Sequence, residues 1–128
     1  RNIYKHNLEE NIILLGEEKD IVSIMNTLDL HILPSKSEAF PLVLLESIAC
    51  GTLSISTNVG DVEKIIKTNS LLVKPENYIS LYEGIINFLT ISKHEKSKII
   101  TQSISHVKSN YSVEKMANSY INIYKNFL

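Results

Sequence analysis

Short apolar runs separated by turn-forming residues occupy the first 75 residues of the chain. Most of these runs are continuous in valine, isoleucine and leucine, which is typical of parallel strands that are covered on both faces. Glycine or proline closes the first two, as Gly16 and Pro34. The four predicted strands are residues 11–15 (NIILL), 30–33 (LHIL), 53–56 (LSIS) and 71–73 (LLV).

Apolar residues at helical spacing lie between these runs. Residues 20–28 predict a helix in which Asp20 is the N-cap or a first-turn acid. A second helix is predicted from Pro41 to Cys50, and Gly51 can end it as the C′ residue. Residues 62–66 predict one or two further helical turns.

Three apolar stripes from Tyr78 onward predict three consecutive helices at the end of the chain. Ser112 is the expected cap of the last one. The stripes are Ile79, Tyr82, Ile85, Ile86 and Leu89; then Ile99, Ile100, Ser103, Ile104 and Val107; then Val113, Met116, Ala117, Tyr120, Ile121, Tyr124 and Leu128. Strands alternating with helices predict the α/β class, as a doubly wound, Rossmann-like parallel sheet with C-terminal helices.

Composition narrows the class of protein. The chain has 128 residues, enough for one domain, with 44% hydrophobic and 21% charged residues. A formal charge of −1 gives no basic surface for nucleic acid. No apolar run is long enough to span a bilayer, and no signal peptide is visible. A single cysteine, Cys50, suits a reducing cytoplasm. Because the chain begins on Arg1, we expect a single, truncated domain of a longer protein.

The segment between the second strand and the helix at Pro41 is placed for ligand binding, because ligands of parallel sheets bind beyond the carboxyl ends of the strands. Proline at the first helical position costs no hydrogen bond. The free N–H groups of Leu42, Val43 and Leu44 would then face this segment with the positive end of the helix dipole. Such a helix start can bind a phosphate or another anion.

Two carboxylates flank that helix start. Glu38 precedes it, and Glu46 lies one turn inside it among apolar neighbours that could not pair with it. A ligand with two hydroxyl groups would satisfy such a carboxylate. The pattern fits a second interpretation equally well, in which Glu46 and Ser47 mark the solvated edge of a buried helix.

Residues 34–51, PSKSEAFPLVLLESIACG, resemble the signature of the C-terminal domain of retaining GT-B glycosyltransferases of group 1, or family 4. In that family two acids stand seven residues apart after a Pro-Ser pair, as Glu38 and Glu46 do here. The similarity extends over residues 12–75. The chain departs from the family at Ala39 and Pro41, which replace glycines of the commonest form, and at Ser70, where a glycine is common. The acid usual in the second loop is missing or shifted by one, next to Lys64.

The resemblance implies a site for a nucleotide-diphosphate sugar. Glu38 would be the catalytic residue that binds the hydroxyls of the donor sugar, and Glu46 would bind the ribose. The backbone N–H groups that face the sugar and phosphate would belong to Phe40, Leu42 and Val43, and the residues near the nucleobase would be Gly16 and Glu17.

The same resemblance implies no metal and no cofactor. It is consistent with the absence of an Asp-x-Asp motif and of ligand spacing among the four histidines. The predicted partners are the nucleotide-sugar donor, a glycan or lipid-linked acceptor, and the N-terminal acceptor domain of the same protein. That domain and the cationic residues that clamp the diphosphate would precede Arg1. We therefore expect this chain alone to transfer no sugar.

The expected role is bacterial capsule, lipopolysaccharide or other surface polysaccharide synthesis, in the cytoplasm or peripherally at the inner face of the cell membrane. One alternative is a non-catalytic GT-B-like module that binds nucleotides or proteins. Another is a sugar-nucleotide epimerase or phosphorylase on the same fold. The stripe with Tyr120, Tyr124 and Phe127 fits a partner, a membrane surface or the N-terminal domain.

Overall fold

A parallel three-stranded sheet forms the centre of the protein in a computed structural model that describes residues 2–68 and 71–127. The strands are β1 (His31–Leu33), β2 (Ser54–Thr57) and β3 (Leu72–Val73), adjacent in that order. Ile32 is paired with Ile55 and Ser56 with Leu72. Three of the four predicted strands are thus confirmed in place, and the parallel sheet is confirmed.

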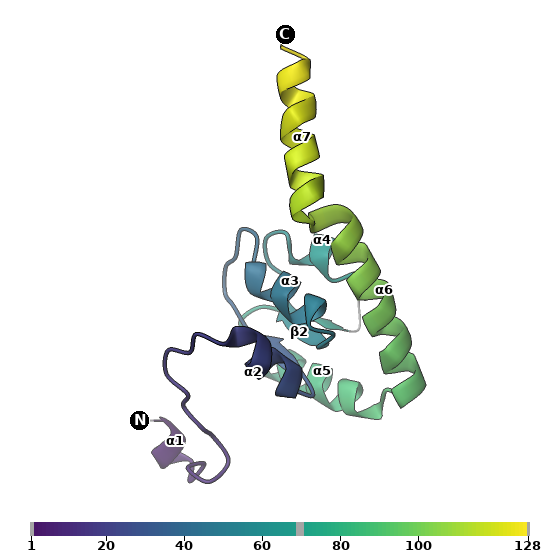
Figure 1. The fold of residues 1–128 in the computed structure, drawn as a ribbon. Helices are drawn as coiled ribbons and strands as arrows, with labels where there is room; N and C mark the ends of the chain where they lie inside the picture. The colour runs from purple at the N-terminus through teal and green to yellow at the C-terminus, as the bar shows by residue number, and fades with distance from the viewer. Residues whose placement is uncertain (1, 69–70, 128) are drawn as a thin grey trace.

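Helices cover both sides of this sheet, since α3 and α5 both contact β2 from opposite sides (Figure 1). Helix α6 packs on α3, and α7 extends away from the body to the C-terminal end (Figure 1). The helices are α1 (Asn2–Lys5), α2 (Ile21–Thr27), α3 (Leu42–Ala49), α4 (Val62–Ile65), α5 (Tyr78–Thr90), α6 (Lys93–Tyr111) and α7 (Val113–Lys125).

The hydrophobic core lies between α3, α4 and the sheet. Leu44 and Ile55 are fully buried, as is Val62 at the start of α4. Phe88 closes the core from α5 on the other side of the sheet. Central β2 is buried along its whole length, whereas β1 is only half-buried.

The helix boundaries agree with the predicted caps. The Asp20 carboxylate accepts hydrogen bonds from the Ser23 N–H at 3.1 Å and the Ser23 hydroxyl at 2.6 Å. Gly51 follows the C-cap of α3 with a φ of 80°, the left-handed conformation that ends many helices. Ser112 ends α6 and caps α7, accepting a hydrogen bond from the Lys115 N–H at 3.2 Å.

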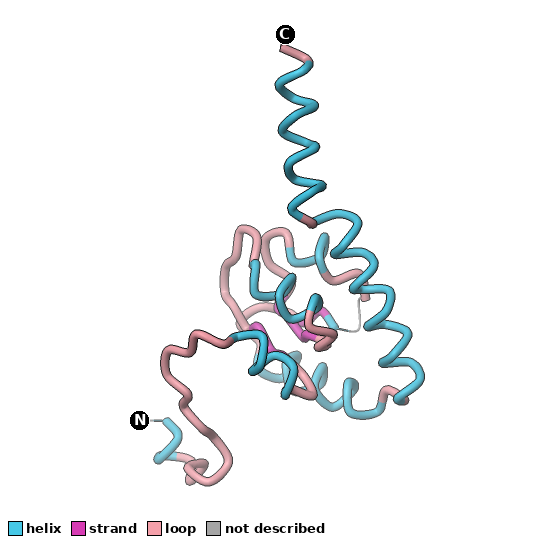
Figure 2. Tube along the Cα trace, viewed as in Figure 1, coloured by secondary structure: helices cyan, strands magenta, loops and turns pink. Residues whose placement is uncertain are grey.

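The prediction of a buried strand at residues 11–15 is wrong. This segment is an exposed loop outside the sheet (Figure 2). Ile13 is 82% exposed and Leu14 is 81% exposed. An apolar run becomes a strand only where a sheet edge offers hydrogen bonds and a helix covers its side chains. In the described part of the chain the segment has neither, so the sheet has three strands instead of four.

Most of the apolar stripe predicted for α5 faces away from the sheet. Of its members only Ile85 packs against the core, and Tyr82 and Leu89 are more than 60% exposed. The face toward the sheet is Leu81, Gly84, Ile85 and Phe88. A Cβ atom at Gly84 would lie 2.7 Å from Val73 Cγ1, so the small residue permits close packing.

The other two stripes differ in their outcome. In α6 Ile99 is buried and Ile100, Ser103 and Val107 are half-buried, as predicted, whereas Ile104 is exposed. In α7 no residue is buried, and the predicted stripe is exposed, Val113 and Tyr124 most strongly. Leu128, the last residue of that stripe, and Ser70 lie outside the described residues.

Candidate functional site

Two loops meet at the carboxyl ends of β1 and β2. The first, residues 34–41, connects β1 to α3, and the second, residues 58–61, connects β2 to α4. The Thr57 hydroxyl donates a hydrogen bond to the Ser35 carbonyl at 2.6 Å. The Asp61 N–H donates one to the Ala39 carbonyl at 3.0 Å. Two hydrogen bonds from the end of β2 and its loop therefore hold the first loop.

Glu38 lies within this first loop and is half-buried. Its carboxylate accepts a hydrogen bond from the Ser35 hydroxyl at 2.7 Å. Such a bond fixes one carboxylate oxygen and leaves acceptor capacity on both oxygens for a ligand. The loop is also joined to the residues after β3 by an ion pair between Lys36 and Glu76. Both side chains of that pair are exposed, so the pair adds little stability.

The start of α3 differs from the sequence prediction by one residue. Pro41 is the N-cap, with an extended backbone (φ −77°, ψ 105°), and not the first helical residue. The Leu44 N–H donates a hydrogen bond to the Pro41 carbonyl at 3.2 Å, so it is not free as predicted. The N–H groups of Leu42 and Val43 belong to the first turn and have no acceptor within the helix.

Glu46 lies on the open side of α3. Its side chain is exposed. Leu42, one turn before it, is 63% exposed. The premise that Glu46 is buried among apolar residues is therefore wrong for the described chain. The alternative, a solvated helix edge, describes the environment of Glu46 better, but it is wrong for Ser47, which is fully buried. Exposure leaves the Glu46 carboxylate accessible to a ligand.

Gly16 and Glu17 lie in the exposed segment before α2. Gly16 has a φ of 77° and no atom within 4 Å of the place where a Cβ would stand. Within the described residues no hydrogen bond joins either of them to Glu38 or Glu46. The predicted sugar and phosphate residues lie on one short stretch of chain, as Glu38, Phe40, Leu42 and Val43. The fold leaves the predicted nucleobase residues apart from that stretch.

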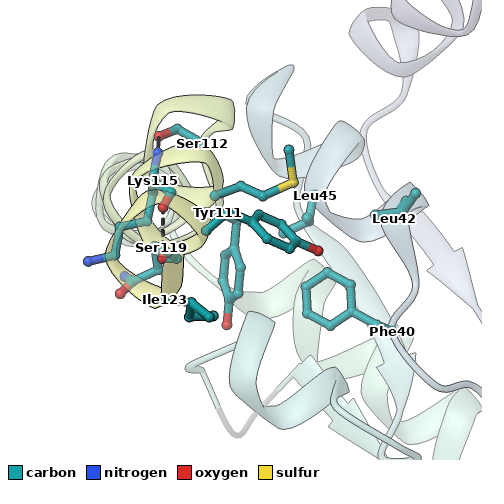
Figure 3. Close-up of a pocket in the computed structure, with 11 residues that line it drawn as sticks. Phe40, Leu42, Leu45, Tyr111, Ser112, Lys115, Ser119 and Ile123 are labelled. Carbon is teal, nitrogen blue, oxygen red and sulfur yellow. Dashed lines mark hydrogen bonds between the residues drawn. The ribbon is translucent and has the colours of Figure 1, made fainter. Parts of the chain in front are cut away.

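Phe40 connects the first loop to the C-terminal helices. Its ring centroid lies 5.4 Å from that of Tyr111, whose hydroxyl donates a hydrogen bond to the Lys64 carbonyl at 3.0 Å. These rings border an open cavity of about 530 Å³ between α3 and α7 (Figure 3). Its lining also includes Met116 and Tyr120 of α7. Sequence reasoning missed Tyr111, although it continues the α6 stripe at helical spacing four residues after Val107.

Among the described residues no three His, Cys, Asp or Glu side chains lie close enough to hold a metal ion. The absence of a metal from the reaction stays a prediction. Cys50 is half-buried at the end of α3, consistent with a packing role.

Comparison with known families decides the classification. The family model described as glycosyl transferases group 1 matches residues 1–105 of the chain. The chain belongs to the group 1 glycosyl transferases. The family predicted from residues 34–51 is thereby confirmed.

Relatives from three organisms agree with this family. A glycosyltransferase structure from Rickettsia africae superimposes with a TM-score of 0.90 at 28% identity, covering 97% of this chain and 34% of that one. The N-acetyl-alpha-D-glucosaminyl L-malate synthase of Bacillus anthracis is 37% identical over 60 residues, 47% of this chain and 16% of the relative. The O-antigen biosynthesis glycosyltransferase WclY of Escherichia coli is 26% identical over 97% of this chain and 36% of its own length.

The chain spans about a third or less of these relatives. The structural likeness confirms the predicted fold, an α/β domain of GT-B type with a parallel sheet and C-terminal helices. None of the helices described has the length and apolar composition that crossing a bilayer requires.

Proposed function

We propose that this chain is the donor-binding part of a retaining glycosyltransferase that transfers a sugar from a nucleotide-diphosphate sugar to a glycan or lipid-linked acceptor. One observation carries the proposal. The half-buried Glu38, hydrogen-bonded to Ser35, stands on a loop that leads directly into the start of α3 at the carboxyl ends of β1 and β2. This edge of a parallel sheet is where nucleotides bind.

Each part of a donor has a matching group in this proposal. Glu38 is the catalytic residue that accepts hydrogen bonds from the hydroxyls of the donor sugar. The backbone of Phe40 faces the sugar, and the N–H groups of Leu42 and Val43 face the distal phosphate. Glu46, exposed one turn further along α3, accepts hydrogen bonds from the ribose hydroxyls. Gly16 and Glu17 would reach the nucleobase only if the exposed segment before α2 moves toward this edge.

The start of α3 supplies the electrostatics. Unpaired N–H groups and the helix dipole favour an anion at this end. Negative charge builds on the departing diphosphate as the bond to the sugar breaks, so these groups stabilise the transition state more than the ground state. No metal is required for this role, and the proposal includes none.

The remainder of the protein completes the proposal. The acceptor would bind to an N-terminal domain of the same protein, which would also cover the exposed apolar side of α7. The Escherichia coli relative is named for O-antigen biosynthesis, which supports a role in surface polysaccharide synthesis. We extend this proposed role to lipopolysaccharide or capsule. We place this activity in the cytoplasm, with peripheral contact at the inner face of the cell membrane.

Calorimetric titration of UDP, GDP and ADP onto the full-length protein tests the proposal. One of the three should bind, and Glu46→Ala should weaken that binding by about 1–3 kcal/mol, because the carboxylate no longer accepts the ribose hydroxyls. Glu83→Ala is the matched control, since it removes an exposed acid from α5 and should leave the affinity unchanged.

Equal affinities of wild type and Glu46→Ala would remove Glu46 from the site. Failure of all three nucleotides to bind the wild-type protein would overturn the donor-binding function and favour a non-catalytic module.

A further inference from the structure

Gly60 lies in the second loop at a place where that loop touches the first. Its φ is 54°, in the left-handed region that favours glycine. A Cβ atom built on it would lie 2.0 Å from the Glu38 carbonyl oxygen, 2.8 Å from the Glu38 carbonyl carbon and 2.9 Å from the Ala39 carbonyl oxygen. Real Cβ atoms do not approach other atoms so closely, so the Gly60 backbone lies directly against the peptide that follows Glu38.

The neighbouring contacts reinforce this one. The Asp61 N–H, next in sequence to Gly60, donates a hydrogen bond to the Ala39 carbonyl. The Thr57 hydroxyl, at the end of β2, donates one to the Ser35 carbonyl. Ser35 in turn donates its hydroxyl hydrogen bond to the Glu38 carboxylate. Three contacts from the end of β2 and its loop therefore reach the loop on both sides of Glu38.

We propose that Gly60 is a positioning residue, which sets the Glu38 carboxylate against the donor sugar by packing on the Glu38–Ala39 peptide. The inference rests on the proposed function, because it assigns Gly60 a part in the same donor site. Gly60 touches no substrate itself and acts through Glu38. Thr57 holds the other end of the same loop through the hydrogen bond from its hydroxyl to the Ser35 carbonyl.

Two features of Gly60 separate this role from an ordinary glycine turn. A positive φ alone occurs also at Gly51, at the end of α3, and at Gly16. At Gly51 the nearest atom to an added Cβ is Ile100 Cγ2 at 3.9 Å, an ordinary contact. At Gly60 the added Cβ meets backbone atoms that cannot rotate away. Gly60→Ala must therefore displace the Glu38–Ala39 peptide, whereas Gly51→Ala strains only its own backbone.

Titrations on the full-length protein test the inference. The probes are UDP-glucose, UDP-N-acetylglucosamine, GDP-mannose and ADP-glucose, with UDP, GDP and ADP. The measured quantity is the ratio of the nucleoside diphosphate Kd to the sugar-donor Kd, taken for the donor that the wild type binds most tightly. This ratio isolates the contacts to the sugar. Gly60→Ala should lower it about tenfold, as expected for one lost hydrogen bond to a carboxylate.

Three further variants complete the test. Gly51→Ala should keep the wild-type ratio, which separates positioning from backbone strain. Thr57→Val should lower the ratio and Thr57→Ser should restore it, because serine keeps the hydroxyl that binds the Ser35 carbonyl. The two Thr57 variants keep the inference testable if the Gly60→Ala protein does not fold. In the double variant with Glu38→Gln, Gly60→Ala should have no additional effect, since both act through one carboxylate.

Different results refute the two proposals. If Glu38→Gln leaves the ratio unchanged, the role of Glu38 in donor binding is refuted, and the inference with it. If Glu38→Gln lowers the ratio but Gly60→Ala matches Gly51→Ala and Thr57→Val matches the wild type, only the positioning role is overturned.

Discussion

The fold changes the pKa of His31. It lies at the start of β1, and burial lowers its pKa from the ordinary value of 6.5. The Ser47 hydroxyl donates to the Thr52 carbonyl at 3.0 Å, so Ser54 donates to Ser47, 2.7 Å away. His31 Nδ1, 3.1 Å from Ser54 Oγ, must then donate the last hydrogen bond. Nδ1 therefore carries the proton of the neutral ring.

This burial predicts a pH dependence of folding. The unfolded chain takes up a proton on His31 near pH 6.5, whereas the folded chain takes it up only at lower pH. The free energy of unfolding should therefore fall as the pH decreases from 7 to 5. His31→Gln should flatten that decrease, measured by urea denaturation at each pH. His94→Gln, at an exposed site of α6, should keep the wild-type slope, and equal slopes for all three proteins would contradict the prediction.

Single-residue chemistry near the candidate site could be predicted only in part. Glu38 and the start of α3 are local features that a continuous stretch of sequence predicts. The residues that hold Glu38 in place cannot be predicted from that stretch. Thr57 and Gly60 lie about twenty residues away in the chain and reach the loop only because β1 and β2 are neighbours in a parallel sheet. The exposure of Glu46 likewise depends on which side of α3 the rest of the fold covers.

At the scale of elements, Gly84 determines how closely α5 approaches the sheet. Alanine favours a helix interior by about 1 kcal/mol over glycine. The new methyl would, however, lie 2.7 Å from Val73 Cγ1, and such overpacking costs about 1–3 kcal/mol. We expect overpacking to outweigh propensity, so Gly84→Ala should lower the free energy of unfolding in urea.

Asn87→Ala on the same helix is the matched control. Asn87 is exposed, so alanine gains helix propensity there without a new contact, and stability should rise by about 0.5 kcal/mol. A rise for Gly84→Ala as well would mean that α5 can shift away from β3 at little cost.

Element boundaries were predictable because their signals are local. Asp20, Gly51 and Ser112 each act within one turn of the helix that they begin or end. The buried side of α5 was not, because its outward side carries the larger apolar residues and a stripe alone does not say which face meets the sheet. The strand prediction for residues 11–15 is wrong for a related reason. An apolar run indicates that its side chains favour burial, but it does not identify the neighbouring element that would bury them.

At the scale of the whole molecule, helices cover both faces of the sheet, whereas apolar side chains near the two ends of the described chain are exposed. Residues 12–15 and the length of α7 expose isoleucine, leucine and tyrosine side chains. Large contiguous apolar surfaces are uncommon on monomeric proteins and mark contacts with other chains or domains. The relatives are about three times as long as the aligned chain, consistent with the proposed N-terminal domain as the partner for α7.

The exposed side of α7 leads to a prediction that compares two lengths of chain. Ile121 and Tyr124 are 47% and 66% exposed, and neither lines the cavity beside Phe40. In the 128-residue chain, Ile121→Ser and Tyr124→Ser should each change the free energy of unfolding by less than about 0.5 kcal/mol. In the full-length protein the same changes should cost about 1 kcal/mol or more, because the N-terminal domain would bury both side chains. Urea denaturation of both chains measures the difference.

Ile99→Val provides the control, because Ile99 is 8% exposed within α6 and loses a buried methyl group in either chain. It should cost about 1 kcal/mol at both lengths. Serine variants of α7 that are neutral in the full-length protein as well would show that this face stays open there. The N-terminal domain would then have to meet the donor site through the loop at Glu38 without using α7.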